Sequence, residues 1–386
     1  MKRQHLLPVV GTALMFASNG ALFASVLPWY PILMRQWGLG ESYFGLIVAC
    51  FALGSLASSA VPAPVVRRLG AVPAMAVGTA VMAVVLVLAG FVLSGGWTLA
   101  LMLLVLGFLD PIVDVAQNLV AVRVQERLGR SIMSSVHASW SLGAACGGAA
   151  GTVAVGRMEM PWHFLVASIV ACGIAGLGCV LVGDVAAVDD PASDGGAGIS
   201  GVMALVAPIA VVAISGTMVE EVANSWAGLL AAEVAGMPVE KAGVALTIML
   251  SAQCVGRFAG DPMVNRWGRI GVAKLGGACI AGGAAVAVLA PGPALFLCGL
   301  GAAGFGCATI VPSAFTAAAQ LPGVSEGAGL TAMSWLMRVG FLSASPLIGV
   351  ASSATDVRAA LVLLLVCGVT VMVLAKRLDP RAGLQR

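Results

Sequence analysis

Long apolar runs dominate the pattern of hydrophobic and polar positions along this chain. Twelve of them are long enough for a helix to cross the ~30 Å hydrocarbon core of a bilayer, and they contain very few charged side chains. They lack the alternation of apolar and polar residues that a barrel strand requires. We therefore predict membrane-spanning helices at residues 9–34, 43–66, 72–93, 98–122, 132–155, 162–182, 202–232, 242–259, 270–290, 294–318, 328–352 and 359–375.

The composition supports a membrane protein. Hydrophobic residues make up 60% and charged residues 10% of the 386 positions, and so few charges could not cover the surface of a soluble domain. The formal net charge of +3 is too small to indicate nucleic-acid binding. All nine cysteines lie within apolar runs and lack metal-ligand spacing. We therefore expect free thiols and neither a metal nor a cofactor.

Basic residues are distributed unevenly between the loops, which indicates an orientation. If the N-terminus is inside, the inner segments carry fourteen Lys and Arg residues and the outer segments carry four, at Arg35, Arg157, Lys241 and Arg358. Inner loops of membrane proteins carry such an excess. We therefore expect a multi-pass protein of a cytoplasmic membrane with both termini in the cytoplasm.

An acidic segment at residues 183–201 divides the chain. It is rich in Gly, Ala, Ser and Asp and has no basic residue, which is typical of a flexible linker. Sliding the chain by 198 positions places Arg-Leu-Gly at 68–70 on Arg-Trp-Gly at 266–268. We therefore predict an all-α membrane fold of two pseudo-symmetric six-helix bundles, residues 1–182 and 202–386, joined by a cytoplasmic linker. Repeated halves are common in secondary transporters.

Few ionisable side chains lie inside the predicted spans. Two carboxylate pairs stand out: Asp110 with Asp114 in the first half, and Glu220 with Glu221 in the second. A carboxylate at membrane depth is costly unless it faces a polar cavity or a partner. These four acids and His137 are the residues that we expect to carry coupling protons.

The span at 98–122 carries a polar stripe. Asp110, Asp114 and Asn118 are spaced four residues apart and so share one helix face, and Pro111 removes a backbone hydrogen bond beside them. His137 lies one turn into the next span, at about the depth of Asp114. A carboxylate beside an imidazole can exchange protons near neutral pH. The alternative is a fixed pair that holds two helices together.

The two glutamates of the span at 202–232 point to different sides. Glu220 shares a face with Asn224, whereas Glu221 is turned by about 100°. One glutamate can therefore face a cavity while the other meets a neighbouring helix. Arg257 and Arg338 are the candidate cations, and a structural ion pair with Arg338 is the alternative to a functional acid.

Polar and aromatic side chains deep in the spans are candidates for binding an organic solute. The three deepest tryptophans lie away from the span ends, where interfacial tryptophans are normally found, and amides add hydrogen-bonding capacity. Helix packing explains these residues equally well. The predicted substrate-binding set is Asn19, Asn118, Trp140, Asn224, Trp226, Gln253, Trp335 and Arg338.

Residues 260–269 read Gly-Asp-Pro-Met-Val-Asn-Arg-Trp-Gly-Arg. They look like the loop signature D-R-x-G-R of the Major Facilitator Superfamily, with Asn265 in the acidic position, and the chain resembles this superfamily over essentially its whole length. The first-half copy has Arg67 in the acidic position. In the family this acid helps to lock one conformational state, so the resemblance implies an altered lock. The implied gating residues are Arg68, Gly70, Asp261, Arg266, Gly268 and Arg269.

Shorter motifs extend the resemblance. Residues 114–118, 137–143 and 345–349 resemble a poorly characterised bacterial group related to sugar permeases. The glycines at 143, 147, 148 and 151 resemble the motif G-x-x-x-G-P-x-x-G of superfamily antiporters, with Gly148 in the proline position. Such spacing is also an ordinary means of close helix packing. The first resemblance favours uptake and the second favours export.

These features predict a secondary active transporter that moves a small organic solute by alternating access, with protons (or sodium) as the coupling ion and a slight preference for efflux by antiport. Symport of a sugar-like or other polar metabolite and passive facilitation stay open. A membrane-embedded enzyme is the rival class, but the chain has no H-E-x-x-H helix, G-x-S-x-G elbow or phosphate-binding loop. We expect a monomer in the lipid bilayer without a nucleic-acid partner.

Overall fold

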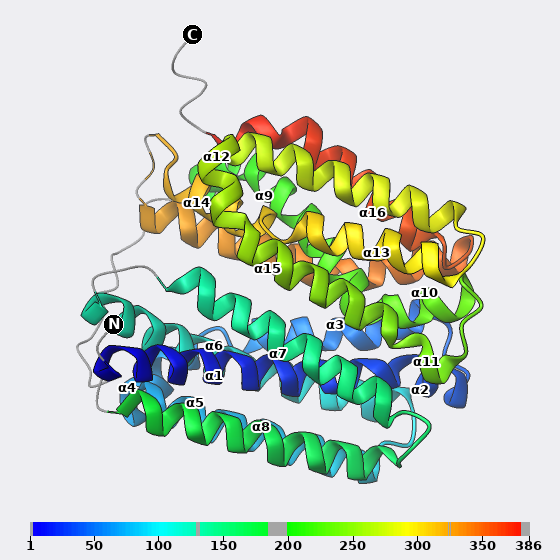
Figure 1. The fold of residues 1–386 in the computed structure, drawn as a ribbon, viewed down its shortest axis with the longest axis horizontal. Helices are drawn as coiled ribbons and strands as arrows, with labels where there is room; N and C mark the ends of the chain where they lie inside the picture. The colour runs from blue at the N-terminus through cyan, green and yellow to red at the C-terminus, as the bar shows by residue number, and fades with distance from the viewer. Residues whose placement is uncertain (1–2, 129–131, 184–198, 323, 325, 380–386) are drawn as a thin grey trace. The chain divides into compact units, whose positions relative to one another are not determined.

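The computed structural model describes residues 3–128, 132–183, 199–322, 324 and 326–379. Within these residues every regular element is a helix (Figure 1), and the helices form two compact units. The N-terminal unit comprises Met1–Pro191 and Pro238–Thr247, and the C-terminal unit comprises Ala192–Met237 and Ile248–Arg386. Each unit is described separately below.

The N-terminal unit follows the predicted spans, with two breaks. The predicted span 9–34 is divided by the 3-10 turn η1, and the predicted span 43–66 is divided between one helix that ends at Ala57 and a separate short helix that begins at Pro62. Pro28 lies in the first break and Pro62 follows the second, and proline lacks the N–H that would continue a helix. The elements are α1 (Arg3–Val26), η1 (Leu27–Trp29), α2 (Tyr30–Trp37), α3 (Glu41–Ala57), α4 (Pro62–Leu69), α5 (Ala71–Val92), α6 (Gly96–Leu128), α7 (Met133–Ala154), α8 (Met160–Val182) and α11 (Val239–Ala242).

The C-terminal unit contains one π-helical turn and one long helix interrupted by a glycine. The elements are α9 (Ile199–Glu221), the π-helix η3 (Val222–Trp226), α10 (Ala227–Glu233), most of α12 (Val244–Leu289), α13 (Pro293–Cys307), α14 (Ile310–Ala319), α15 (Glu326–Ala354), α16 (Ala359–Leu374) and the 3-10 turn η4 (Ala375–Leu378). Two predicted spans, 242–259 and 270–290, both fall in α12. The break between them comes at Gly268, where the helical backbone is interrupted.

The two glycines that the sequence repeat superposes have the same unusual backbone. Gly70 has φ 85° and ψ 157°, and Gly268 has φ 70° and ψ 164°. A side chain at positive φ clashes with the backbone, so glycine is the residue that adopts this conformation without strain. Each glycine allows one helix to stop and the next to begin at once, in the same loop of each half.

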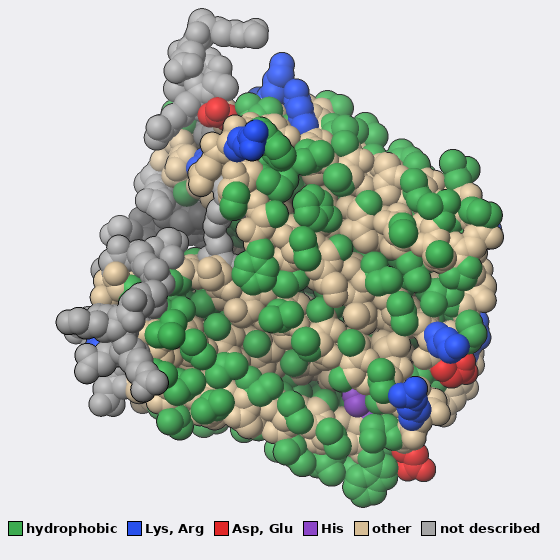
Figure 2. All heavy atoms as spheres, in the orientation of Figure 1, with side chains coloured by type: hydrophobic (Ala, Val, Ile, Leu, Met, Phe, Trp, Pro, Cys, Tyr) green, Lys and Arg blue, Asp and Glu red, His purple; other side chains and the backbone are tan. Residues whose placement is uncertain are grey.

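Ten stretches of the described residues are long and apolar enough to cross a membrane. The predicted spans 43–66 and 132–155 do not meet this criterion: α3 has 17 residues, and serines, glycines and His137 lower the hydropathy of α7. Large apolar side chains remain exposed along the other helices, for example Leu289 at 80% and Val180 at 77%. Figure 2 shows hydrophobic side chains over most of the visible face, with charged ones near the helix ends. The all-α membrane fold is confirmed, whereas the count of twelve spans is not.

The glycines of α7 pack this helix closely against α1. A Cβ built on Gly143 meets the backbone carbonyl of Ala17, and one on Gly147 meets that of Ala21. Gly143 and Gly147 are four residues apart, and so are Ala17 and Ala21. The two backbones therefore approach each other along matching helix faces. These two members of the antiporter-like glycine motif therefore have a packing role inside the N-terminal unit.

We expect Gly143→Ala to destabilise the protein by roughly 1–3 kcal/mol, because the new methyl group must push α7 away from the α1 backbone. Gly176→Ala is the matched control: it lies in the interior of α8 and its Cβ meets nothing within 4 Å. That control should be neutral or slightly stabilising, because alanine favours helices over glycine. Thermal melting of the two purified variants in detergent checks this. Equal melting temperatures would contradict the close approach.

Candidate functional site

The first candidate site lies on α6 of the N-terminal unit. Asp110 is half-buried, and Asp114 is exposed although it lies near the middle of a 33-residue apolar helix. The helix runs through Pro111 without a break. The two carboxylates are near enough to repel each other electrostatically. An exposed carboxylate at this depth requires polar surroundings, because hydrocarbon would not solvate it.

The side chains closest to these acids include neutral amides. Asn118 Nδ2 donates to Asp114 Oδ1 at 3.0 Å, and Gln117 Nε2 donates to the same oxygen at 3.3 Å. Asp110 lies close enough to the side chain of Asn19 on α1 to interact with it. Amides orient a carboxylate without neutralising its charge. The structure thus brings together three residues that the sequence placed in two categories: Asp110, Asp114 and Asn19.

Trp140 of α7 fixes the orientation of the Asn19 amide. Its indole Nε1 donates to Asn19 Oδ1 at 2.8 Å, so the Asn19 nitrogen is the atom that faces Asp110. The ring of Trp140 also lies 6.0 Å from that of Phe23. His137, expected beside Asp114, has its ring edge-on to Phe16 of α1 at 5.1 Å. Accordingly α7 packs mainly on α1 and has little contact with α6.

The second candidate site is centred on Glu220 in the C-terminal unit. Arg257 Nη2 lies 3.0 Å from Glu220 Oε1, and the two side chains are 18% and 20% exposed. Gln253 Nε2 donates to the same carboxylate oxygen at 2.5 Å and to the thiol sulfur of Cys307 at 3.6 Å. Arg257 and Gln253 are one turn apart on α12, so one helix face supplies both donors. The cation beside Glu220 is therefore Arg257.

Glu221 belongs to a separate, more deeply buried network. Ser345 Oγ on α15 donates to Glu221 Oε1 at 2.6 Å, and Trp226 Nε1 donates to Ser345 Oγ at 3.0 Å. The π-helix η3 follows directly after Glu221. Such single wide turns often occur at functional sites. Asn224 lies inside this turn, and its buried Oδ1 has no hydrogen-bond partner.

The remaining predicted substrate-binding residues differ in exposure. Trp226 is completely buried, so its ring has a packing role in this conformation, whereas Trp335 on α15 is 44% exposed. Arg338 is partly buried on the same helix. Trp335 is therefore the more accessible of these two tryptophans.

The predicted gating residues lie at the ends of helices. Arg68 is exposed at the end of α4, and Arg266 is exposed before Gly268 in α12. Arg269 Nη1 donates to Gln320 Oε1 at 2.9 Å, which ties this loop to the end of α14. The side chain of Asp261 is outside the part that the structure describes. The site set as a whole stays a prediction.

Three residues of these networks were missed by sequence reasoning: Gln117, Cys307 and Ser345. Gln117 could have been found, because it lies three residues after Asp114 on the same helix and such residues are neighbours. Ser345 and Cys307 are distant in sequence from the acids that they join and are of residue types common in apolar helices. Only the folded arrangement identifies those two.

Comparison with known proteins settles the family. The model of the Major Facilitator Superfamily matches residues 12–325 of this chain. The chain belongs to the Major Facilitator Superfamily. Two bacterial relatives are similar over most of their lengths. An uncharacterized transporter of Sinorhizobium fredii is 28% identical, and the match covers 92% of this chain and 94% of the relative. An uncharacterized transporter of this superfamily type from Yersinia pestis is 26% identical, covering 88% of each.

Solved structures agree on the superfamily fold. A bacterial homolog of the human lysosomal transporter Spinster, in an inward-facing and unoccupied conformation, has a TM-score of 0.73 at 12% identity and covers 98% of each chain. The nucleoside transporter NupG has a TM-score of 0.68 at 12% identity, covering 97% of this chain and 98% of that chain. At these identities the likeness concerns the fold. The superfamily moves small molecules across membranes, so this chain is a multi-pass membrane transporter and not an enzyme.

Proposed function

We propose that this superfamily member is a proton-coupled secondary transporter of a small organic solute in a bacterial inner membrane, with both termini in the cytoplasm. In this proposal Asp110 carries the coupling proton. The observation that carries the proposal is the pair Asp110–Asp114, which lies inside an apolar helix and in which Asp114 has neutral amides as hydrogen-bond partners.

A proton relieves the repulsion between two neighbouring carboxylates, and its loss restores that repulsion. The electrostatic free energy of the two neighbouring carboxylates therefore depends on whether a proton is bound to them. A coupling site requires this dependence. Asp114 is exposed and can receive the proton, whereas Asp110 is half-buried and lies near Asn19 of α1. Release of the proton changes the charge at a point where two helices are joined.

The direction of transport follows from weaker features. The glycine motif and the sugar-permease motif at 137–143 lie in α7, so they are not independent of the packing described above, whereas the other two sugar-permease motifs lie in α6 and α15. We retain antiport as the proposed mode. Symport stays the alternative, because the same acids serve both modes. In antiport the solute and the proton occupy the acids in turn.

Proton flux in proteoliposomes tests the proposal. The purified protein is reconstituted with a pH-sensitive dye inside the vesicles, and pools of sugars, amino acids, nucleosides and organic amines are added outside. We expect one pool to change the internal pH, and the change should persist when sodium is replaced by choline. A pool that enters the vesicles with no pH change would refute proton coupling, and a signal that requires sodium would replace the proton by that ion.

A further inference from the structure

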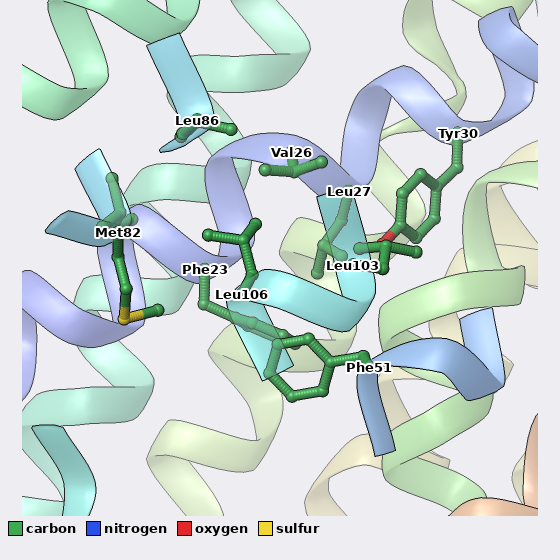
Figure 3. Close-up of a pocket in the computed structure, with 10 residues that line it drawn as sticks. Phe23, Val26, Leu27, Tyr30, Phe51, Met82, Leu86, Leu103 and Leu106 are labelled. Atoms are coloured by element: carbon green, nitrogen blue, oxygen red, sulfur yellow. The ribbon is translucent and has the colours of Figure 1, made fainter. Parts of the chain in front are cut away.

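A small apolar pocket lies in the N-terminal unit among α1, η1, α2, α3, α5 and α6 (Figure 3). Aliphatic side chains and the rings of Phe23 and Phe51 line it, and Tyr30 points its hydroxyl group toward Leu103. Its volume of about 20 Å³ admits a single water molecule. The pocket therefore has no room for an organic solute. A buried group whose role is still open lies instead in the C-terminal unit, at Glu221.

Glu221 is the last residue of α9 and belongs to a buried hydrogen-bond network. It is 5% exposed, Ser345 is 1% exposed and Trp226 is completely buried. Ser345 Oγ accepts the indole N–H of Trp226 at 3.0 Å and donates to Glu221 Oε1 at 2.6 Å. One serine of α15 therefore contacts the residues at both ends of the π-helical turn η3.

The wide turn explains how one serine can contact both residues. Glu221 and Trp226 are five positions apart, and in an α-helix side chains at this spacing point about 140° away from each other. In a π-helix the backbone hydrogen bonds join residues five apart, so such side chains lie nearly one above the other. The extra residue in η3 therefore turns the carboxyl group and the indole toward the same residue of α15.

The surroundings of Glu221 differ from those of a charged carboxylate. In the part of the chain that the structure describes, no ion pair joins Glu221 to a basic side chain. An apolar cluster of Met218, Ala344 and Cys367 lies one turn before Glu221 on α9 and beside Ser345 on α15. The described titratable side chains on α9 and on the elements packed against it are, besides Glu221, Glu220, Cys307, Arg338, Cys367, Lys376 and Arg377.

Two adjacent glutamates thus meet opposite conditions. Arg257 Nη2 lies 3.0 Å from Glu220 Oε1, so a charge on Glu220 has a counter-charge. The polar groups near Glu221 include neutral hydroxyls: Ser345 donates to it, and Ser225 lies close enough to interact. A hydroxyl group orients a carboxyl group but brings no net charge. Without a cation or water beside it, a carboxyl group at membrane depth is more stable in its neutral form.

We propose that Glu221 holds a proton in this conformation and that its neutral carboxyl group fastens α9 to α15 through Ser345. Glu220, one position earlier, stays ionised beside Arg257. The C-terminal unit thus has a proton-binding site of its own, in addition to the proposed coupling residue Asp110 of the N-terminal unit. Loss of the proton would leave a buried charge without a counter-charge. The contact between α9 and α15 must therefore admit water before Glu221 can ionise.

Infrared spectroscopy of the purified full-length protein in detergent at neutral pH tests the protonation state. A protonated carboxyl group has a C=O stretching band that a carboxylate lacks. We expect this band in the difference between the spectra of the wild type and Glu221→Gln. The difference for Glu220→Gln should contain carboxylate bands instead. Asp356→Asn is the reference for such bands, because it removes a carboxylate that is 52% exposed.

Ser345→Ala tests the contact between the two helices. The substitution removes the hydroxyl group that donates to Glu221, so the C=O band should remain and move to higher frequency. Ser343→Ala is the matched control on the same helix. Its hydroxyl group is bonded to the backbone oxygen of Gly340, so the band should stay in place.

Melting temperatures give a second readout of the protonation state. Glutamine has nearly the shape of a neutral glutamic acid, so Glu221→Gln should melt at or above the temperature of the wild type. Glu220→Gln should melt several degrees lower, because it leaves the charge of Arg257 without its partner. The two substitutions are chemically identical and one position apart, so the difference reports the surroundings of each glutamate.

Carboxylate bands in place of the C=O band in the Glu221→Gln difference would overturn the proposal. A band that does not move in Ser345→Ala would remove the connection to α15. A Glu221→Gln variant that fails to fold would also contradict the proposal, because an amide should replace a neutral acid without such a loss. None of these measurements needs a solute or a gradient. Absence of proton flux in proteoliposomes would therefore refute the proposed function and leave this site standing, and an ionised Glu221 would do the reverse.

Discussion

Asp110→Asn is expected to reduce solute-driven proton movement in proteoliposomes to the level of protein-free vesicles. The amide has nearly the shape of the carboxyl group, and its oxygen can still accept a hydrogen bond from a neighbouring amide such as that of Asn19. It cannot carry an exchangeable proton in the working pH range. The variant should therefore fold normally, and its loss of coupling should be specific.

Two matched variants define how the result is interpreted. Asp114→Asn removes the exposed member of the pair and should slow the proton signal without abolishing it, because Asp110 remains. Asp356→Asn removes a surface carboxylate that is 52% exposed and should have no effect. Full coupling in Asp110→Asn would show that the proton is carried elsewhere, and Glu221 would then be the next acid to test.

Much of the fold was predictable because apolar runs and punctuation residues act locally. The prolines at 28 and 62 mark helix breaks that the span prediction passed over, although the residue type alone gave the signal. The shared conformation of Gly70 and Gly268 agrees with the tripeptide repeat. The short apolar length of α3 was less visible, because the residues after the break extend the same apolar run.

The partners of the buried acids were much less predictable. A helix face orders residues within one segment, and it correctly grouped Asp114 with Asn118. It says little about which neighbouring helix faces them, so Ser345 as the partner of Glu221 was missed. The π-helix after Glu221 adds a residue to one turn and changes the register that the face assignment assumes. The pocket needs side chains from several helices and has no signature in any one of them.

The ion pair Glu220–Arg257 gives the second large expected effect, this time on stability. Arg257→Gln leaves the Glu220 carboxylate mostly buried and without its cation, and we expect the free energy of unfolding to fall by roughly 3 kcal/mol. Glu220→Gln should produce a similar loss, because it strands the charge of Arg257. The double variant should recover most of the stability, because two neutral amides can hydrogen-bond to each other without a desolvated charge.

The exposed pair Asp356–Arg358 provides the matched control, with 52% and 51% exposure and an N–O distance of 3.2 Å. Neutralising either partner there should change stability by about 1 kcal/mol or less, because solvent screens exposed pairs. Thermal melting of all variants in one detergent gives the comparison. A double variant no more stable than either single one would mean that the charges do not stabilise each other. If the double variant is stable but inactive in transport, the pair serves the transport cycle in addition to the fold, because stability and activity then separate at the same two residues.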